Sequence, residues 1–195
     1  MDEIRKPKEE IRNDIAKRLA ALADSAVEAK ARQIEKRLFE FANFLEANVV
    51  LLYINSASEV NSRDIIKSCL DYNKIVILPA FNIDTYEMKL MKVDNLETDL
   101  KLGPRGIYEP NETRCNVVPI ECIDIAIIPG TAFDEKGGRI GSGEGYYDRL
   151  IPKLSITTRK VALAFENQIT QQIQMESHDK HVDIIITEKR IIYKI

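Results

Sequence analysis

The fold class of this chain is determined by two stretches, Val49-Val50-Leu51-Leu52-Tyr53-Ile54 and Lys74-Ile75-Val76-Ile77-Leu78-Pro79. Each is a short, continuous apolar run rich in β-formers, which is typical of a strand covered on both faces. Between them, residues 59–72 have the apolar spacing of a helix, and we expect Pro79 to end the second strand. A strand, a helix and a strand in this order predict a right-handed crossover in a parallel sheet.

The pattern repeats further along the chain. Residues 123–128, 161–165 and 182–187 are further candidate buried strands with helical segments between them, and residues 88–93 are a candidate antiparallel addition. We therefore predict an α/β fold with an open, mainly parallel, doubly wound sheet and helices on both faces, a Rossmann-like arrangement of three layers. Residues 1–195 are expected to form a single domain.

The first fifty residues have a helical pattern. Ile11, Ile15, Leu19 and Leu22 recur at the spacing of one helix face, and a second helix is predicted from about Ala26 to Leu45. By contrast, residues 94–119 contain several glycines and prolines and are expected to form a long irregular connection, which is often a functional segment.

Composition excludes several classes of function. Of 195 residues, 28 are Lys or Arg and 31 are Asp or Glu, so the net charge of -3 gives no overall basic field for nucleic acid. No apolar segment reaches membrane-spanning length, and the start Met-Asp-Glu-Ile does not resemble a secretory signal, so we expect a cytoplasmic protein. Three cysteines without CxxC spacing predict reduced thiols, and the isolated His178-x-x-His181 pair is weak evidence for zinc.

Glycine is concentrated in one place. Six of the eight glycines fall within residues 130–145, directly after a predicted strand and before the helix-like Tyr146-Tyr147-Asp148-Arg149-Leu150. Such a loop presents backbone N–H groups that bind phosphate, at the strand ends where α/β proteins bind ligands. The spacing fits neither the dinucleotide fingerprint nor the P-loop. The alternative is a turn that only needs glycine conformations.

This region also carries a family resemblance. Residues 129–134 (PGTAFD) and 138–149 (GRIGSGEGYYDR) resemble the signature of the 5-formyltetrahydrofolate cyclo-ligase family. Lys8 with Arg12, Tyr53 with Glu59-Val60, residues 103–110 and residues 162–166 resemble further family motifs in the same order. The resemblance therefore spans most of the chain.

The resemblance implies an enzyme that uses ATP and Mg2+ to convert 5-formyltetrahydrofolate to 5,10-methenyltetrahydrofolate, releasing ADP and phosphate. It assigns catalysis to Arg139 and Glu59, folate contacts to Ile54, Glu59 and Tyr146, and Mg2+ to Asp148 and Asp183. It assigns ATP contacts to Lys8, Arg12, Arg139, Ile140, Gly141, Ser142, Gly143, Glu144, Gly145, Tyr146 and Tyr147. We expect this small-molecule substrate as the partner, with no nucleic acid or membrane, and a monomer or weak homo-oligomer.

Several alternatives stay open at the level of sequence. Lys8 and Arg12 could form an ordinary solvated helix face, Glu59 could cap a helix, and one of the two tyrosines could be a core residue. Glu144 stands where the family usually has Gly or a basic residue, and it places an anion in the loop unless it turns to solvent or pairs with Arg139 or Arg149. A binding protein of the same fold with little or no turnover, or a cyclo-ligase for a different formylated pterin, are the alternative functions.

Overall fold

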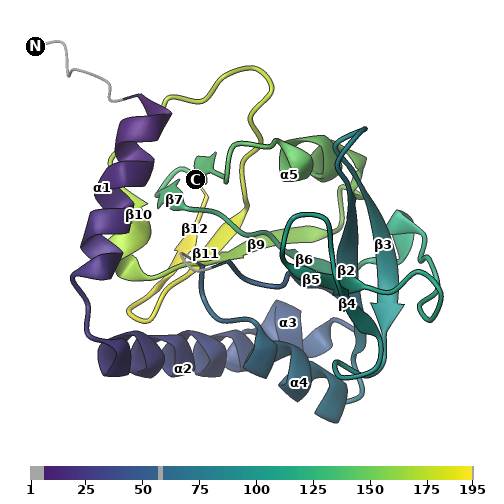
Figure 1. Ribbon diagram of the computed structural model, residues 1–195. Coiled ribbons are helices and arrows are strands. Elements are labelled where there is room, and N and C mark those ends of the chain that lie inside the picture. The colour runs from purple at the N-terminus through teal and green to yellow at the C-terminus, as the bar shows by residue number, and fades with distance from the viewer. Residues whose placement is uncertain (1–6, 57–58, 195) are drawn as a thin grey trace, which may run out of the picture.

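The fold is built on a mixed β-sheet. The computed structural model describes residues 7–56 and 59–194, and within them seven strands pair in the order β12-β11-β9-β6-β1-β2-β3 (Figure 1). The five central strands are parallel, and β3 and β12 are antiparallel edge strands. The bounds are β1 Val49–Leu51, β2 Ile75–Asn82, β3 Glu87–Val93, β6 Ile125–Ile127, β9 Arg159–Leu163, β11 Ile184–Ile186 and β12 Ile191–Tyr193. The predicted mainly parallel α/β sheet is confirmed.

Both faces of the sheet are covered, as the continuous apolar strands predict. Val50 packs into a core with the helices α2, α3 and α4, whereas its neighbour Leu51 packs into a second core with α5, because successive strand residues point to opposite faces. In Figure 1, α2, α3 and α4 lie below the sheet and α5 lies above it. The helices are α2 Asp24–Glu40, α3 Ala42–Glu46, α4 Arg63–Asp71 and α5 Tyr146–Leu150.

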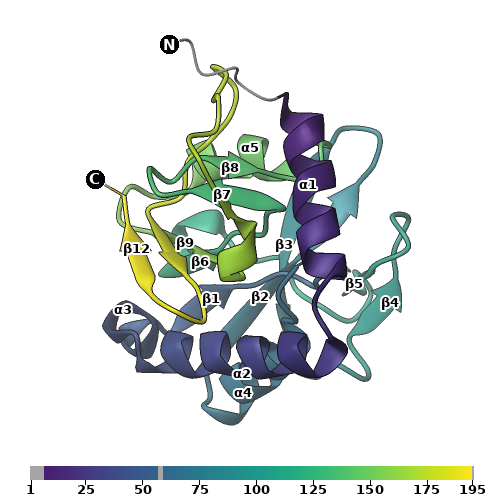
Figure 2. The same cartoon turned by 90° about the vertical axis from the view of Figure 1, so that its left-hand side faces the viewer.

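Helix α1, Lys8–Ala20, packs on a small second sheet in the order β10-β7-β8 (Figure 2). These strands are β7 Ala132–Asp134, β8 Arg139–Ile140 and β10 Ile169–Thr170. Ile11 and Ile15 form a separate apolar cluster with Ala132 and Ile140. The contact lays α1 against the segment that leads into the glycine-rich residues.

One predicted helix is divided in the structure, and one predicted strand is longer than expected. The helix expected over residues 26–45 divides at Phe41, whose extended backbone (ψ 119°) separates α2 from α3. Strand β2 continues through Pro79 to Asn82, whereas we expected it to stop at the proline. Pro79 lies opposite Leu90, whose carbonyl accepts from Val118 on the far side, so the missing proline N–H breaks no bond to β3.

The later crossovers contain less helix than predicted. Helix α5 has five residues and continues into the 3-10 turn η2, Ile151–Lys153. Between β9 and β11, the described residues form only the 3-10 turn η3, Glu166–Gln168, and strand β10. The connection over residues 94–119 carries a hairpin, β4 Leu100–Leu102 with β5 Tyr108–Pro110, and leads to the 3-10 turn η1, Ile120–Cys122.

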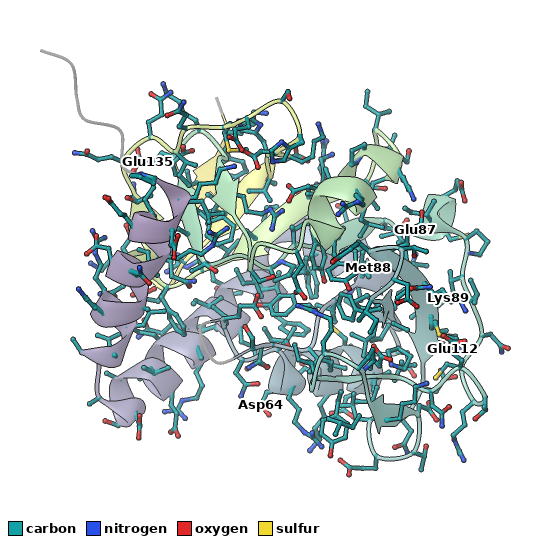
Figure 3. The ribbon with its side chains drawn as sticks, turned by 45° about the horizontal axis from the view of Figure 1, so that its top comes forward. Asp64, Glu87, Met88, Lys89, Glu112 and Glu135 are labelled. Carbon is teal, nitrogen blue, oxygen red and sulfur yellow. The ribbon has the colours of Figure 1, made fainter. Side chains whose placement is uncertain are left out.

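Strand β3 is the antiparallel addition expected near residues 88–93, and it protects one edge of the sheet with charge. Figure 3 shows Glu87, Met88 and Lys89 along this edge, with Glu112 beside Lys89. The Lys89 ammonium lies 3.1 Å from the Glu112 carboxylate, and both side chains are exposed. Charged side chains on an edge strand disfavour pairing with another chain.

In the part of the chain that the structure describes, no helix is long and apolar enough to cross a membrane.

Gly137 in the β7–β8 turn is expected to tolerate no side chain. It has φ +81°, and a Cβ atom there would lie 2.3 Å from the Val182 carbonyl oxygen. Gly137→Ala should therefore lower the free energy of unfolding by about 3 kcal/mol in urea denaturation. Gly106→Ala is the matched control, since Gly106 has φ +72° but open space around it, and it should cost only about 1 kcal/mol. Equal losses in the two variants would contradict the steric argument.

Candidate functional site

A cavity of about 320 Å³ opens at the carboxyl ends of β1 and β6. These two strands are neighbours at the point where the strand order reverses, since the chain continues from β1 to β2 on one side and from β6 to β9 on the other. Ligands of open α/β sheets bind at such a switch point. Tyr53 and Ile54 follow β1 and Pro129 follows β6, and all three line the cavity.

One wall of the cavity is the glycine loop, residues 141–145, which joins β8 to α5. Gly143 and Gly145 have φ +106° and +72°, and Arg12 on α1 donates from Nε to the Gly141 carbonyl at 2.9 Å. Among the described residues, none accepts a hydrogen bond from the backbone N–H groups of the glycine loop. A run of free N–H groups beside cationic side chains is suited to an anion such as phosphate.

Arg139 lies under the glycine loop with its side chain 3% exposed. Its guanidinium donates from Nη1 to the Pro129 carbonyl at 3.0 Å and from Nη2 to Asp148 Oδ1 at 2.8 Å. Its Nε is buried and has no hydrogen-bond partner in the parts of the chain described. The fork therefore fixes the end of β6 to the start of α5 and places a buried positive charge at the cavity.

Asp148 is the carboxylate of this wall. Oδ1 accepts from Arg139 and from the Lys180 N–H at 3.1 Å, whereas Oδ2 accepts no hydrogen bond within residues 7–56 and 59–194. One oxygen of a cavity-lining carboxylate is thus available for a cation.

Asp183 is placed differently from the prediction. It precedes β11 at the amino end of the strand and does not line the cavity, and its Oδ2 accepts from the Lys160 N–H at 3.0 Å and pairs with Lys160 Nζ at 3.1 Å. The structure therefore does not join Asp183 to Asp148 as a pair of metal ligands. A carboxylate beside a buried strand needed a partner, as the sequence indicates, but the partner is a lysine.

A segment that the sequence analysis did not assign to the site closes the outer side of the cavity. Lys8 Nζ lies 2.9 Å from Glu176 Oε2 and 2.5 Å from Asp179 Oδ2, and His178 lines the cavity beside them. Burial opposes ionisation of Asp179, but the Glu176 N–H and the Lys8 ammonium outweigh it and lower its pKa. Lys8 is therefore held by carboxylates rather than free for a ligand.

The segment that follows β1 and the start of α5 supply further lining residues of the cavity. Tyr53 donates to the Val60 carbonyl at 3.1 Å, and Glu59 accepts from the Ser56 N–H at 2.8 Å. The Tyr147 hydroxyl is buried and has no partner in the described chain. Burial, together with the nearby charge of Glu59, raises the pKa of Tyr53 and of Tyr147. Both Tyr146 and Tyr147 are buried, and both line the cavity.

Glu144 is not among the residues that line the cavity, although Gly143 and Gly145 on either side are. Its carboxylate pairs with Arg105, from the turn between β4 and β5, whereas the alternatives left open by the sequence were a turn to solvent or a pair with Arg139 or Arg149. Arg149 instead donates to the Glu144 carbonyl at 3.2 Å. No sequence signal links residues 105 and 144, because the contact depends on how the long connection folds back.

The structure brings nearly all of the predicted site residues to one cavity. The predicted residues that line it are Lys8, Arg12, Ile54, Glu59, Arg139, Ile140, Gly141, Ser142, Gly143, Gly145, Tyr146, Tyr147 and Asp148. The additional lining residues are Tyr53, Ser56, Phe81, Arg105, Ile107, Pro129, Glu176, His178 and Asp179. Most of these follow strands or lie in irregular segments, where hydrophobic periodicity gives no signal.

The fold and the cavity define an α/β protein with a glycine-walled ligand site at a topological switch point, lined by both arginines and carboxylates. Residues 4–188 match the model of the 5-formyltetrahydrofolate cyclo-ligase family, and the chain belongs to that family. The probable 5-formyltetrahydrofolate cyclo-ligase of Schizosaccharomyces pombe is 30% identical over 96% of this chain and 98% of its own length. The 5-formyltetrahydrofolate cyclo-ligase of Haemophilus influenzae is 31% identical over 88% of this chain and 92% of its own.

A solved structure agrees with this assignment. The solution structure of 5,10-methenyltetrahydrofolate synthetase from Aquifex aeolicus has a TM-score of 0.83 and 30% identity, covering 96% of this chain and 92% of that one. The expected family and its α/β fold are therefore confirmed, and the chain is an enzyme of the cyclo-ligase type.

Proposed function

We propose that this protein uses ATP and Mg2+ to close 5-formyltetrahydrofolate to 5,10-methenyltetrahydrofolate in the cavity described above. The observation that supports it best is the glycine loop, whose backbone N–H groups have no acceptor among the described residues and which both Arg12 and the buried Arg139 adjoin at Gly141. Such a site can hold the phosphates of a nucleotide, and Ile54, Phe81 and Tyr146 give the same cavity apolar surfaces suited to a planar pterin.

The reaction that we propose has two steps. The formyl oxygen attacks the γ-phosphorus as the bond from that phosphorus to the β,γ-bridging oxygen breaks, and ADP leaves. The neighbouring folate nitrogen, which lies outside the pterin rings, then attacks the activated formyl carbon and releases its proton to solvent, and the carbon–oxygen bond breaks to release phosphate. Phosphoryl transfer of this kind needs mainly positioning and charge neutralisation, which Arg139 and the loop N–H groups can supply.

Asp148 fits a role in holding Mg2+. Magnesium in nucleotide sites is bound through one or two carboxylates and the substrate phosphates, and Asp148 offers one oxygen that accepts no protein hydrogen bond among the described residues. When bound, Mg2+ neutralises charge on the phosphates. We therefore assign the metal to Asp148 alone among the two predicted carboxylates.

Glu59 and the Tyr147 hydroxyl are placed to orient the folate. Glu59 is an acceptor at the end of the segment after β1, and Tyr147 supplies a buried hydroxyl without a protein partner in the described residues. A buried polar atom without a partner is costly unless a ligand completes its hydrogen bonds. We propose that pterin N–H groups pair with Glu59 and that Tyr147 pairs with a polar atom of the substrate.

The test is direct. Protein incubated with 5-formyltetrahydrofolate and MgATP should give the absorbance of the methenyl product together with one ADP per product. Binding of both ligands without product would favour the non-catalytic alternative. Product from a different formylated pterin but not from 5-formyltetrahydrofolate would show that the pterin is misassigned.

We expect a monomer or weak homo-oligomer in the cytoplasm.

Glu59→Gln should weaken the reaction with the folate without weakening the binding of the nucleotide. The amide keeps the size and the acceptor oxygen but loses the charge, so kcat/KM for the folate should fall roughly tenfold to a hundredfold. Affinity for a non-hydrolysable ATP analogue should change less than twofold. A variant with unchanged folate kinetics would remove Glu59 from the substrate site and favour its role in the turn with Ser56.

A further inference from the structure

Arg105 is an arginine that neither the sequence nor the proposed reaction assigned. It lies in the turn between β4 and β5, within the long connection, and yet its side chain is only 16% exposed. Its guanidinium carbon lies 4.4 Å from the centre of the Phe81 ring and 5.0 Å from the centre of the Tyr146 ring. The two rings themselves meet edge to face with centres 4.9 Å apart. Arginine on aromatic faces is held in a defined place.

The guanidinium fork of Arg105 is directed at the glycine loop. Nε and Nη2 each donate to a different oxygen of Glu144, the first at 3.3 Å, so the contact is bidentate. A bidentate arginine–carboxylate pair has more geometric definition than a single ion pair. Arg105 thereby joins the β4–β5 hairpin to the glycine loop, and both segments line the cavity.

The glycine loop needs such an attachment. Glu144 lies between Gly143 and Gly145, both with positive φ, so the backbone around it has little conformational preference of its own. The backbone is held by Arg12 at Gly141 and by Arg149 at the Glu144 carbonyl. Three of the five loop residues are glycines, so Ser142 and Glu144 supply the side chains of the loop. Arg105 binds the longer of these two side chains, that of Glu144. Ordering a loop before a ligand arrives removes that entropy cost from binding.

We propose that Arg105 is a positioning residue that holds the glycine loop in its ligand-binding shape by pairing with Glu144. The anion that the sequence places in a phosphate-binding loop is thus neutralised by Arg105 and attaches the loop to the β4–β5 hairpin. The part of the inference that concerns nucleotide affinity rests on the proposed function, whereas the part that concerns the order of the loop does not.

A double-mutant cycle tests the positioning role. Arg105→Ala, Glu144→Ala and the double variant are titrated with a non-hydrolysable ATP analogue in the presence of Mg2+. Arg105→Ala should weaken affinity on the order of tenfold in the natural background and less than twofold when Glu144 is already alanine. An equal loss in both backgrounds would overturn the proposal and show that Arg105 acts on the ligand directly.

NMR relaxation of the unliganded protein tests the order of the loop independently of its function. The backbone order parameters of residues 141–145 should fall from about 0.85 toward about 0.6 in both single variants, because the loop samples more conformations. Arg63→Ala is the matched control, since Arg63 pairs with Glu97 at 2.6 Å on the exposed surface away from the cavity. Unchanged order parameters in the Arg105 variant would overturn the proposal. Order parameters that fall as expected in a protein that binds no ATP analogue would instead refute the nucleotide assignment.

Discussion

Arg139→Ala is expected to lower turnover by roughly a hundredfold to a thousandfold and to lower the free energy of unfolding by about 3 kcal/mol. The guanidinium is buried and hydrogen-bonded to Asp148 and to the Pro129 carbonyl, so the alanine leaves a carboxylate and a carbonyl without their donor. It also removes the cation that would neutralise charge developing on the phosphoryl group. Urea denaturation and the absorbance of the methenyl product measure the two effects.

Two further variants separate folding from chemistry for Arg139. Arg139→Lys keeps the charge but not the fork, and it should recover part of the stability while turnover stays low. Arg190→Ala removes an exposed arginine that pairs with Glu135 and Glu166, and it should change stability by less than about 1 kcal/mol and leave turnover unchanged. Turnover in Arg139→Ala equal to that of the unmutated protein would exclude this arginine from the reaction.

Asp148→Asn is expected to raise the Mg2+ concentration for half-maximal turnover at least about tenfold. The asparagine carbonyl can still accept from Arg139 and from the Lys180 N–H, so the variant should fold and lose less stability than Arg139→Ala. Mg2+ titration of turnover gives the first value. The thermal shift that the ATP analogue produces, measured with and without Mg2+, gives a second measure of metal binding that does not depend on turnover.

The control for Asp148 is the other carboxylate that the sequence suggested. Asp183→Asn keeps the acceptor for the Lys160 N–H and removes only the ion pair with Lys160 Nζ. It should leave the Mg2+ requirement as it is in the natural protein. An increased requirement in this variant, with none in Asp148→Asn, would reverse the assignment that we draw from the cavity.

The sequence by itself was sufficient for the parts of this protein that local pattern controls. The apolar runs at residues 49–54 and 74–79 predicted buried parallel strands, because a strand covered on both faces must be apolar at every position. The crowding of glycine over residues 130–145 located the loop at the cavity, and the motifs around it indicated the family that the comparisons confirm. The spacing of Ile11 and Ile15 likewise set the face on which α1 packs.

Tertiary structure decided which charged groups meet. Arg105 and Glu144 are 39 positions apart, and Lys8 is separated from Asp179 by 171, so no periodicity relates the partners. Asp183 shows the same limit, since its place at the amino end of β11 commits it to Lys160 rather than to the cavity. A charge at one position is compatible with many partners, and which one it meets depends on how the loops cross the ends of the strands. Burial patterns specify the sheet, whereas the pairing of charges is specified only when the whole chain has folded.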